Sequence, residues 1–196
     1  MWTKTELFRG AAVLAIASLT WAGCGSRPPA PTVASRPVAS AAGEQYRLAV
    51  EPEGVRSILQ VRQEAKNGDD VVLVGRIGGD AQPWVEGRAA FSLVDLSARA
   101  CSDIPGHVCT TPWDYCQERD KLAQVKTFIK LVGDDGQPVA TDARELLGVK
   151  ELDTLVVLGK AQRDESGNLT ILASKVFVRP TRPSESAPPS ESAPHN

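Results

Sequence analysis

Five short apolar runs constrain the fold of this 196-residue chain more than any other feature. Each run is rich in Val, Ile, Leu or Phe and has the length of a β-strand rather than that of a helix. Strong turn signals, Gly133–Gly136 and Asp164–Asn168, follow two of the runs closely. We therefore predict strands over residues 71–77, 89–95, 125–132, 154–161 and 169–178.

Two helices are expected among these strands. Residues 55–65 carry apolar side chains at helical spacing and are followed by Asn67-Gly68, a typical helix stop. A shorter helix is expected over residues 141–147, between the third and fourth strands, with Gly148 at its end.

This order of elements is that of the OB-fold, and individual strands also resemble OB strands. The similar segments are 71–77 with its central glycine, Phe91–Asp95, Leu155–Lys160 and Leu169–Ala173. We therefore predict a mainly β fold, a five-stranded OB-like barrel with an N-terminal helix and a short helix between strands three and four. The alternative is another small antiparallel barrel or a sandwich.

Three further motifs resemble a group of exported OB-like proteins without an assigned activity. They are Gly75–Gly79, Gly87–Phe91 and Thr111–Cys116, the last reading Thr-Pro-Trp-Asp-Tyr-Cys. The resemblance implies the fold and export, and it implies no chemistry.

The first 23 residues have the features of an export signal. Lys4 and Arg9 supply positive charge, and residues 11–19 are apolar but shorter than the roughly 20 residues that span a bilayer. Trp21–Cys24 resembles the lipobox of bacterial lipoproteins, in which the cysteine is acylated and becomes the N-terminus. This resemblance implies an exported protein, anchored to a membrane by lipid on Cys24 and facing the periplasm or the cell exterior. Ordinary secretion and a transmembrane anchor are the alternatives.

Composition divides the chain into segments. After the signal peptide 1–23, residues 24–43 are rich in Pro, Ala and Ser and are predicted to form a disordered tether. Residues 180–196 contain a repeated Ser-Glu-Ser-Ala-Pro and are predicted to form a disordered low-complexity tail. The OB-like domain is expected over 44–179, with an insertion at 96–123.

The insertion contains Cys101, His107, Cys109 and Cys116. Exported proteins meet oxidising conditions, so we expect two of the three cysteines to form a disulfide, with the pairing left open. The alternative is a zinc or copper site, because three thiolates and one imidazole form a known zinc set. That pattern here lacks the usual Cys-x₂₋₄-Cys pair. A catalytic Cys109–His107 pair is a third interpretation.

The remaining signals favour a binding protein. Neither a Gly-rich phosphate loop nor a metalloprotease motif is present, so we expect no enzyme and no cofactor. Trp113 and Tyr115 are expected to cover the mouth of the barrel. We expect a non-catalytic lipoprotein whose OB-like domain binds a protein, peptide or envelope ligand, as OB-folds bind ligands on their second and third strands.

Single-stranded nucleic acid is the alternative ligand. Lys126, Phe128 and Lys130 share one face of the third strand, opposite Thr127, Ile129 and Leu131, and Arg76 is expected near them. A net charge of −2 opposes this interpretation, because it supplies no basic field for phosphates.

Replacement of Cys24 by alanine tests the anchor. Cys24→Ala is expected to leave the chain unprocessed or to release it from membranes, because the acylated sulfur is then missing. Membrane fractionation and mass spectrometry of the N-terminus measure both effects. An unacylated N-terminus in the parent chain, with fractionation that Cys24→Ala does not change, would contradict the prediction.

Overall fold

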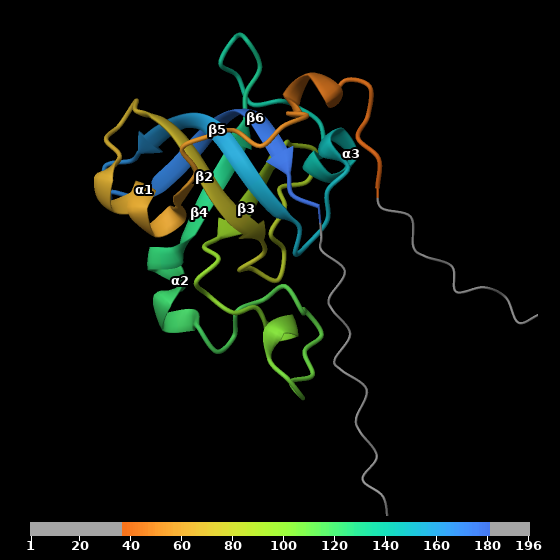
Figure 1. Cartoon of the computed structure of the whole chain (residues 1–196), viewed down its shortest axis with the longest axis vertical. Helices are drawn as coiled ribbons and strands as arrows, with labels where there is room; N and C mark the ends of the chain where they lie inside the picture. Colours follow the sequence, from red (N-terminus) through yellow and green to blue (C-terminus); the bar gives the residue numbers. More distant parts are fainter. Residues whose placement is uncertain (1–36, 181–196) are drawn as a thin grey trace, which may run out of the picture. The chain divides into compact units, whose positions relative to one another are not determined.

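A computed structural model of the chain describes residues 37–180 (Figure 1). Within them the fold is mainly β, with six strands in one mixed sheet and a few short helices. The predicted signal peptide 1–23, Cys24, most of the tether and the tail from residue 181 lie outside the described residues. In the described part of the chain, no helix is both long enough and apolar enough to cross a bilayer.

Backbone pairing links five of the six strands in a circuit. The strands are β1 (Arg56–Ser57), β2 (Asp70–Ile77), β3 (Ala90–Val94), β4 (Lys126–Leu131), β5 (Thr154–Arg163) and β6 (Leu169–Val178). Their order is β1-β2-β3-β4-β6-β5, and β2 also pairs with β5. Pairing therefore runs from β2 through β3, β4, β6 and β5 back to β2. The β1–β2 and β4–β6 pairs are parallel, and the others are antiparallel.

The five predicted strands are confirmed within two residues at each end, but the predicted strand count was wrong. The additional strand β1 occupies residues that the sequence assigned to the first helix. Ser57 is the N-cap of that helix and is itself extended, so Arg56 and Ser57 pair with Leu73 and Val74 of β2. An N-cap residue keeps non-helical backbone angles, which is why the helix starts later than its apolar spacing suggests.

Three α-helices accompany the strands. Helix α1 (Ile58–Glu64) begins with a capping box, in which Ser57 and Gln60 each bond the other's backbone N–H. Helix α3 (Ala143–Leu147) lies between β4 and β5, as predicted, and ends at Gly148. Helix α2 (Arg119–Val125) was not predicted. Its apolar residues Leu122 and Val125 are three positions apart, a weak signal in seven residues.

The main core takes side chains from every strand of the circuit. In β4 the alternation is as predicted: Thr127, Ile129 and Leu131 are buried, and the residues between them are half-buried. Helix α1 packs against this core through Ile58 and Val61.

Gly75 makes the close approach of α1 possible. A Cβ atom at this position in β2 would lie 2.8 Å from Cδ1 of Ile58 and 2.9 Å from the Val94 carbonyl oxygen.

Contacts of the domain begin before residue 44, the predicted boundary of the tether. The Ser40 N–H donates to the carbonyl oxygens of Glu145 and Leu146 in α3, at 3.3 and 3.2 Å. The Gly43 N–H donates in turn to the Ser40 carbonyl oxygen at 2.8 Å. These hydrogen bonds attach residues 40–43 to the folded domain.

Removal of a core side chain from the circuit is expected to be costly. Ile171 of β6 is fully buried, and Ile171→Ala is expected to lower the free energy of unfolding by about 2–5 kcal/mol. Glu165 is exposed in the turn between β5 and β6, so Glu165→Ala is the control and is expected to stay within about 0.5 kcal/mol. Urea unfolding measures both. Equal effects of the two substitutions would contradict the assigned core.

Candidate functional site

The cysteine-containing insertion packs against the end of β3 through a second small apolar core. Tyr115, only 1% exposed, lies at the centre of this second core, with Val94, Ala98, Ala100 and Val125. The structure therefore buries Tyr115 beneath the insertion, whereas the sequence placed it over the barrel mouth. Burial raises the pKa of the Tyr115 hydroxyl to about 12, because the phenolate would lose its hydration.

Two of the motifs that carry the family resemblance meet in space. At the end of β2, the Gly79 N–H donates to the Trp113 carbonyl oxygen at 3.0 Å. Gly78 has a φ of +154°, and a Cβ there would lie 2.4 Å from the same oxygen. Glycine is required at Gly78 both for its backbone angle and for this contact. The half-buried Trp113 also donates from Nε1 to the Ala81 carbonyl oxygen at 3.3 Å.

An ion pair attaches the other side of the insertion to the sheet. Arg76 of β2 donates from Nη1 to Oδ2 of Asp103 at 2.6 Å. The same carboxylate oxygen accepts the Ala100 N–H at 3.0 Å. Arg76 is in register with Val94 of β3 and Lys126 of β4, but its guanidinium bonds the insertion.

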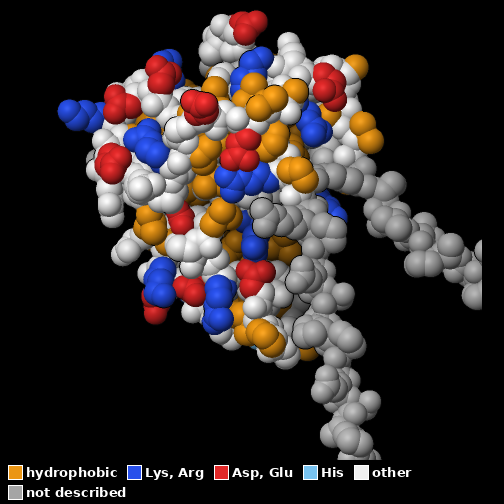
Figure 2. All heavy atoms as spheres, viewed as in Figure 1, with side chains coloured by type: hydrophobic (Ala, Val, Ile, Leu, Met, Phe, Trp, Pro, Cys, Tyr) orange, Lys and Arg blue, Asp and Glu red, His pale blue; other side chains and the backbone are white. Residues whose placement is uncertain are grey.

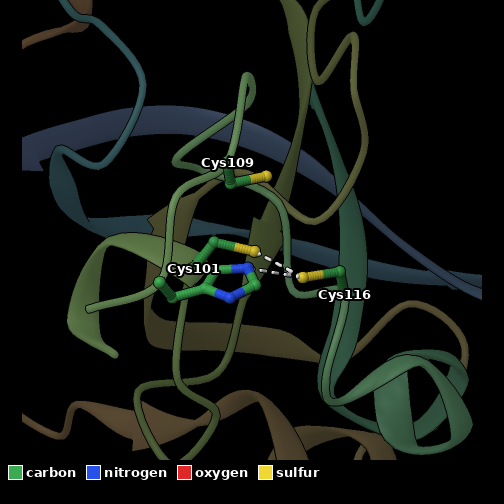
Figure 3. Close-up of side chains that lie close together, drawn as sticks. Cys101, Cys109 and Cys116 are labelled. Atoms are coloured by element: carbon green, nitrogen blue, oxygen red, sulfur yellow. Dashed lines mark hydrogen bonds between the residues drawn. The ribbon is translucent and has the colours of Figure 1, made fainter. Parts of the chain in front are cut away.

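The insertion brings together the four residues that the sequence singled out. The donor atoms of Cys101, His107, Cys109 and Cys116 all lie within 4.8 Å of one another. Sγ of Cys116 is 2.7 Å from Sγ of Cys101 and 3.4 Å from Nε2 of His107 (Figure 3). Cys101 is buried, and the other three residues are half-buried.

Backbone hydrogen bonds hold the segments that carry these side chains. The N–H groups of Cys101 and Ser102 donate to the carbonyl oxygens of Asp114 and Pro112, at 2.8 and 3.0 Å. A turn then returns the chain to the cluster, with the His107 N–H donating to the Ile104 carbonyl oxygen at 3.1 Å. The cluster is thus built by the backbone of the insertion as well as by its side chains.

The thiols of Cys101 and Cys109 differ in acidity. Burial, together with the contact with Cys116, raises the pKa of the Cys101 thiol to about 12. Hydrogen bonding with the side chain and backbone of Thr111 lowers the pKa of the Cys109 thiol. Of these two thiols, that of Cys109 therefore ionises more easily.

Cys101, Cys109 and Cys116 are free thiols in the described structure. The 2.7 Å between Cys101 and Cys116 exceeds the roughly 2.05 Å of a disulfide bond, so the expected disulfide is not formed in the structure. Cys101 and Cys116 are nevertheless the pair whose sulfurs lie close enough for oxidation to join them in a disulfide. The hydrogen-bond partner of His107 in the cluster is Cys116, and not Cys109 as in the catalytic interpretation.

A groove of about 440 Å³ lies over β3 and β4. Its walls include Ser92 of β3, Lys126 and Phe128 of β4, and Leu122 of α2. Val85, in the loop before β3, also lines it. A second hollow of about 370 Å³ shares Val85 and Phe128 and extends to Arg88 and Lys130. Lys130 Nζ lies 6.0 Å from the centre of the Phe128 ring.

An ion pair and a further cation, Arg62, line the groove. Lys126 Nζ lies 2.8 Å from Oδ1 of Asp80, whose other oxygen accepts a hydrogen bond from Ser92 Oγ at 2.8 Å. Acidic and basic side chains are also interspersed on the face shown in Figure 2. Sequence reasoning missed Asp80, because no spacing pattern pairs a loop carboxylate with a strand 46 residues later.

Comparison with known proteins does not assign the chain to a family: no family model matches it, and no curated protein is significantly similar to it in sequence.

A glycine substitution tests how the insertion is attached. Gly78→Ala is expected to cost about 1–3 kcal/mol more than Gly136→Ala, because it adds a clash with the Trp113 carbonyl to an unfavourable φ. Gly136 is the matched control, since its φ is also positive, at +74°, but no atom lies within 4 Å of the added Cβ. Urea unfolding measures the difference, and the alkylation rate of Cys109 reports loosening of the insertion. Equal destabilisation by the two variants would refute this attachment.

Proposed function

We propose that this chain is an exported, lipid-anchored, non-catalytic protein whose OB-like barrel binds a peptide or other envelope ligand in the groove over β3 and β4. The observation that carries the binding function is the groove itself. It lies on the two strands that correspond in order to the second and third strands of an OB-fold, the pair on which OB-folds bind ligands.

Strand pairing supports the OB-like barrel. The circuit β2-β3-β4-β6-β5 returns to β2, as in a closed or nearly closed barrel. Helix α3 joins β4 to β5, the third and fourth strands of that circuit along the chain. The analogy concerns the fold, and the ligand is argued from the groove.

The groove offers a ligand apolar surface and hydrogen-bonding groups together, with Arg62 as a further cation in its lining. Phe128 and Val85 offer apolar surface, whereas Ser92 and the Asp80–Lys126 pair offer hydrogen-bonding groups at the same site. Binding sites commonly combine apolar surface with a few polar groups that fix orientation. Peptides and glycans present both kinds of surface, so envelope polymers fit this site.

Single-stranded nucleic acid is the second candidate. The half-buried side chains of Lys126, Phe128 and Lys130 follow one face of β4, and an aromatic platform beside cations is the usual arrangement for stacking bases. Asp80 opposes this function, because its carboxylate already balances Lys126 and would repel phosphate.

Soluble peptidoglycan fragments, which contain both sugar and peptide, are the probe for this site. Calorimetric titration of the full chain is expected to detect binding that Phe128→Ala weakens about tenfold, the effect of losing roughly 1.4 kcal/mol of contact. Phe177→Ala is the matched control, because this half-buried phenylalanine lines a different hollow beside residues 47–49.

If Phe128→Ala leaves the binding of the fragments unchanged, the groove is not their binding site. Salt-sensitive binding of a dT oligonucleotide, without binding of the fragments, would instead establish the nucleic-acid alternative.

A further inference from the structure

We propose that Cys101, His107, Cys109 and Cys116 bind one zinc ion in a tetrahedral site that organises the insertion. This inference does not depend on the ligand of the groove. It rests on the convergence of the four side chains, whose donor atoms lie within 4.8 Å of one another.

One distance within the cluster matches a zinc site, and another has to lengthen. Two sulfurs bound to zinc at about 2.3 Å in a tetrahedron are about 3.8 Å apart, and a sulfur and a nitrogen are about 3.6 Å apart. The 3.4 Å between Cys116 Sγ and His107 Nε2 matches this arrangement. Cys101 and Cys116, at 2.7 Å, need to separate by about 1 Å to admit the ion.

A metal accounts for more of the cluster than a disulfide does. A bond between Cys101 and Cys116 uses two sulfurs and does not explain why His107 and Cys109 lie beside them. Nevertheless, the turn at Gly106, with a φ of +74°, brings the chain back so that both reach the other two residues. Three thiolates and one imidazole leave no open coordination position, which is the pattern of structural rather than catalytic zinc.

Proton balance determines the charge of the proposed site. Each of the three cysteines loses its thiol proton on binding, and His107 binds through the neutral Nε2, so one zinc ion displaces three protons. Three thiolates around a divalent cation carry a net charge of −1.

The location of the site explains what the ion would stabilise. The insertion shares a small core of five buried residues with the end of β3 and the end of α2: Val94, Ala98, Ala100, Tyr115 and Val125. The ion would join the segments at residues 101, 107–109 and 116, immediately before α2. Leu122 of α2 lies both against this core and in the wall of the groove. Zinc would therefore hold one wall of the binding site.

Metal analysis of the full chain tests the proposal. Chain purified under argon with a thiol-free reductant is expected to bind one equivalent of zinc, measured by plasma mass spectrometry. Cobalt in its place is expected to give the strong visible bands of tetrahedral thiolate coordination. His107→Ala and Cys109→Ser are expected to weaken zinc binding by at least about 100-fold, since loss of a mere outer-shell partner already costs about 10–100-fold. Both residues are half-buried, so these variants avoid the buried Cys101.

His195→Ala is the matched control, because His195 is the other histidine of the chain, and it is expected to keep the zinc. Circular dichroism verifies that each variant is folded. Absence of zinc uptake by the reduced chain would overturn the proposal. Unchanged zinc binding in both His107→Ala and Cys109→Ser would overturn it too. Copper bound at the same stoichiometry in place of zinc would overturn the choice of metal. A Cys101–Cys116 disulfide in chain purified without reductant, together with no zinc uptake by the reduced chain, would establish the disulfide instead.

Discussion

The pairing of β2 with both β3 and β5 is the constraint on which the rest of the structure depends. Seven residues of β2, Asp70 to Arg76, lie opposite seven residues of β5, Lys160 to Thr154, and this pairing completes the circuit of strands. Paired strands leave few unbonded backbone groups, which are costly when buried. With the circuit complete, one face of each strand can contribute to a common core, against which α1 packs beside Gly75.

The end of β2 also determines where the insertion is attached. Gly78 and Gly79 admit the Trp113 carbonyl, and Arg76, three residues before Gly79, holds Asp103. Two points of the insertion are thus fixed to one short stretch of chain. The second core, built around Tyr115, fills the space between the insertion and the sheet. This explains how a long connection can be ordered despite the entropy lost on folding.

The groove and the cysteine cluster share a structural element although their chemistry differs. Helix α2 follows Cys116 by a few residues, leads directly into β4 and presents Leu122 to the groove. The groove combines apolar surface with the Asp80–Lys126 ion pair and a further cation, Arg62. The cluster gathers soft donors, which suit a thiolate-binding metal. In the proposed arrangement the cluster supports the binding face, and the groove supplies the contact with the ligand.

The sequence by itself determined the strands, because their apolar runs and the turn signals that follow them are local properties. It also identified the four donor residues and the face of β4 that carries Phe128. Only the tertiary structure decided the sixth strand, helix α2, the burial of Tyr115 and the pairing of Arg76 with Asp103. Each of these depends on contacts between residues far apart in the chain, which residue spacing does not encode. For the same reason, the sequence left open which cysteines meet, and the fold of the insertion brought all three to His107.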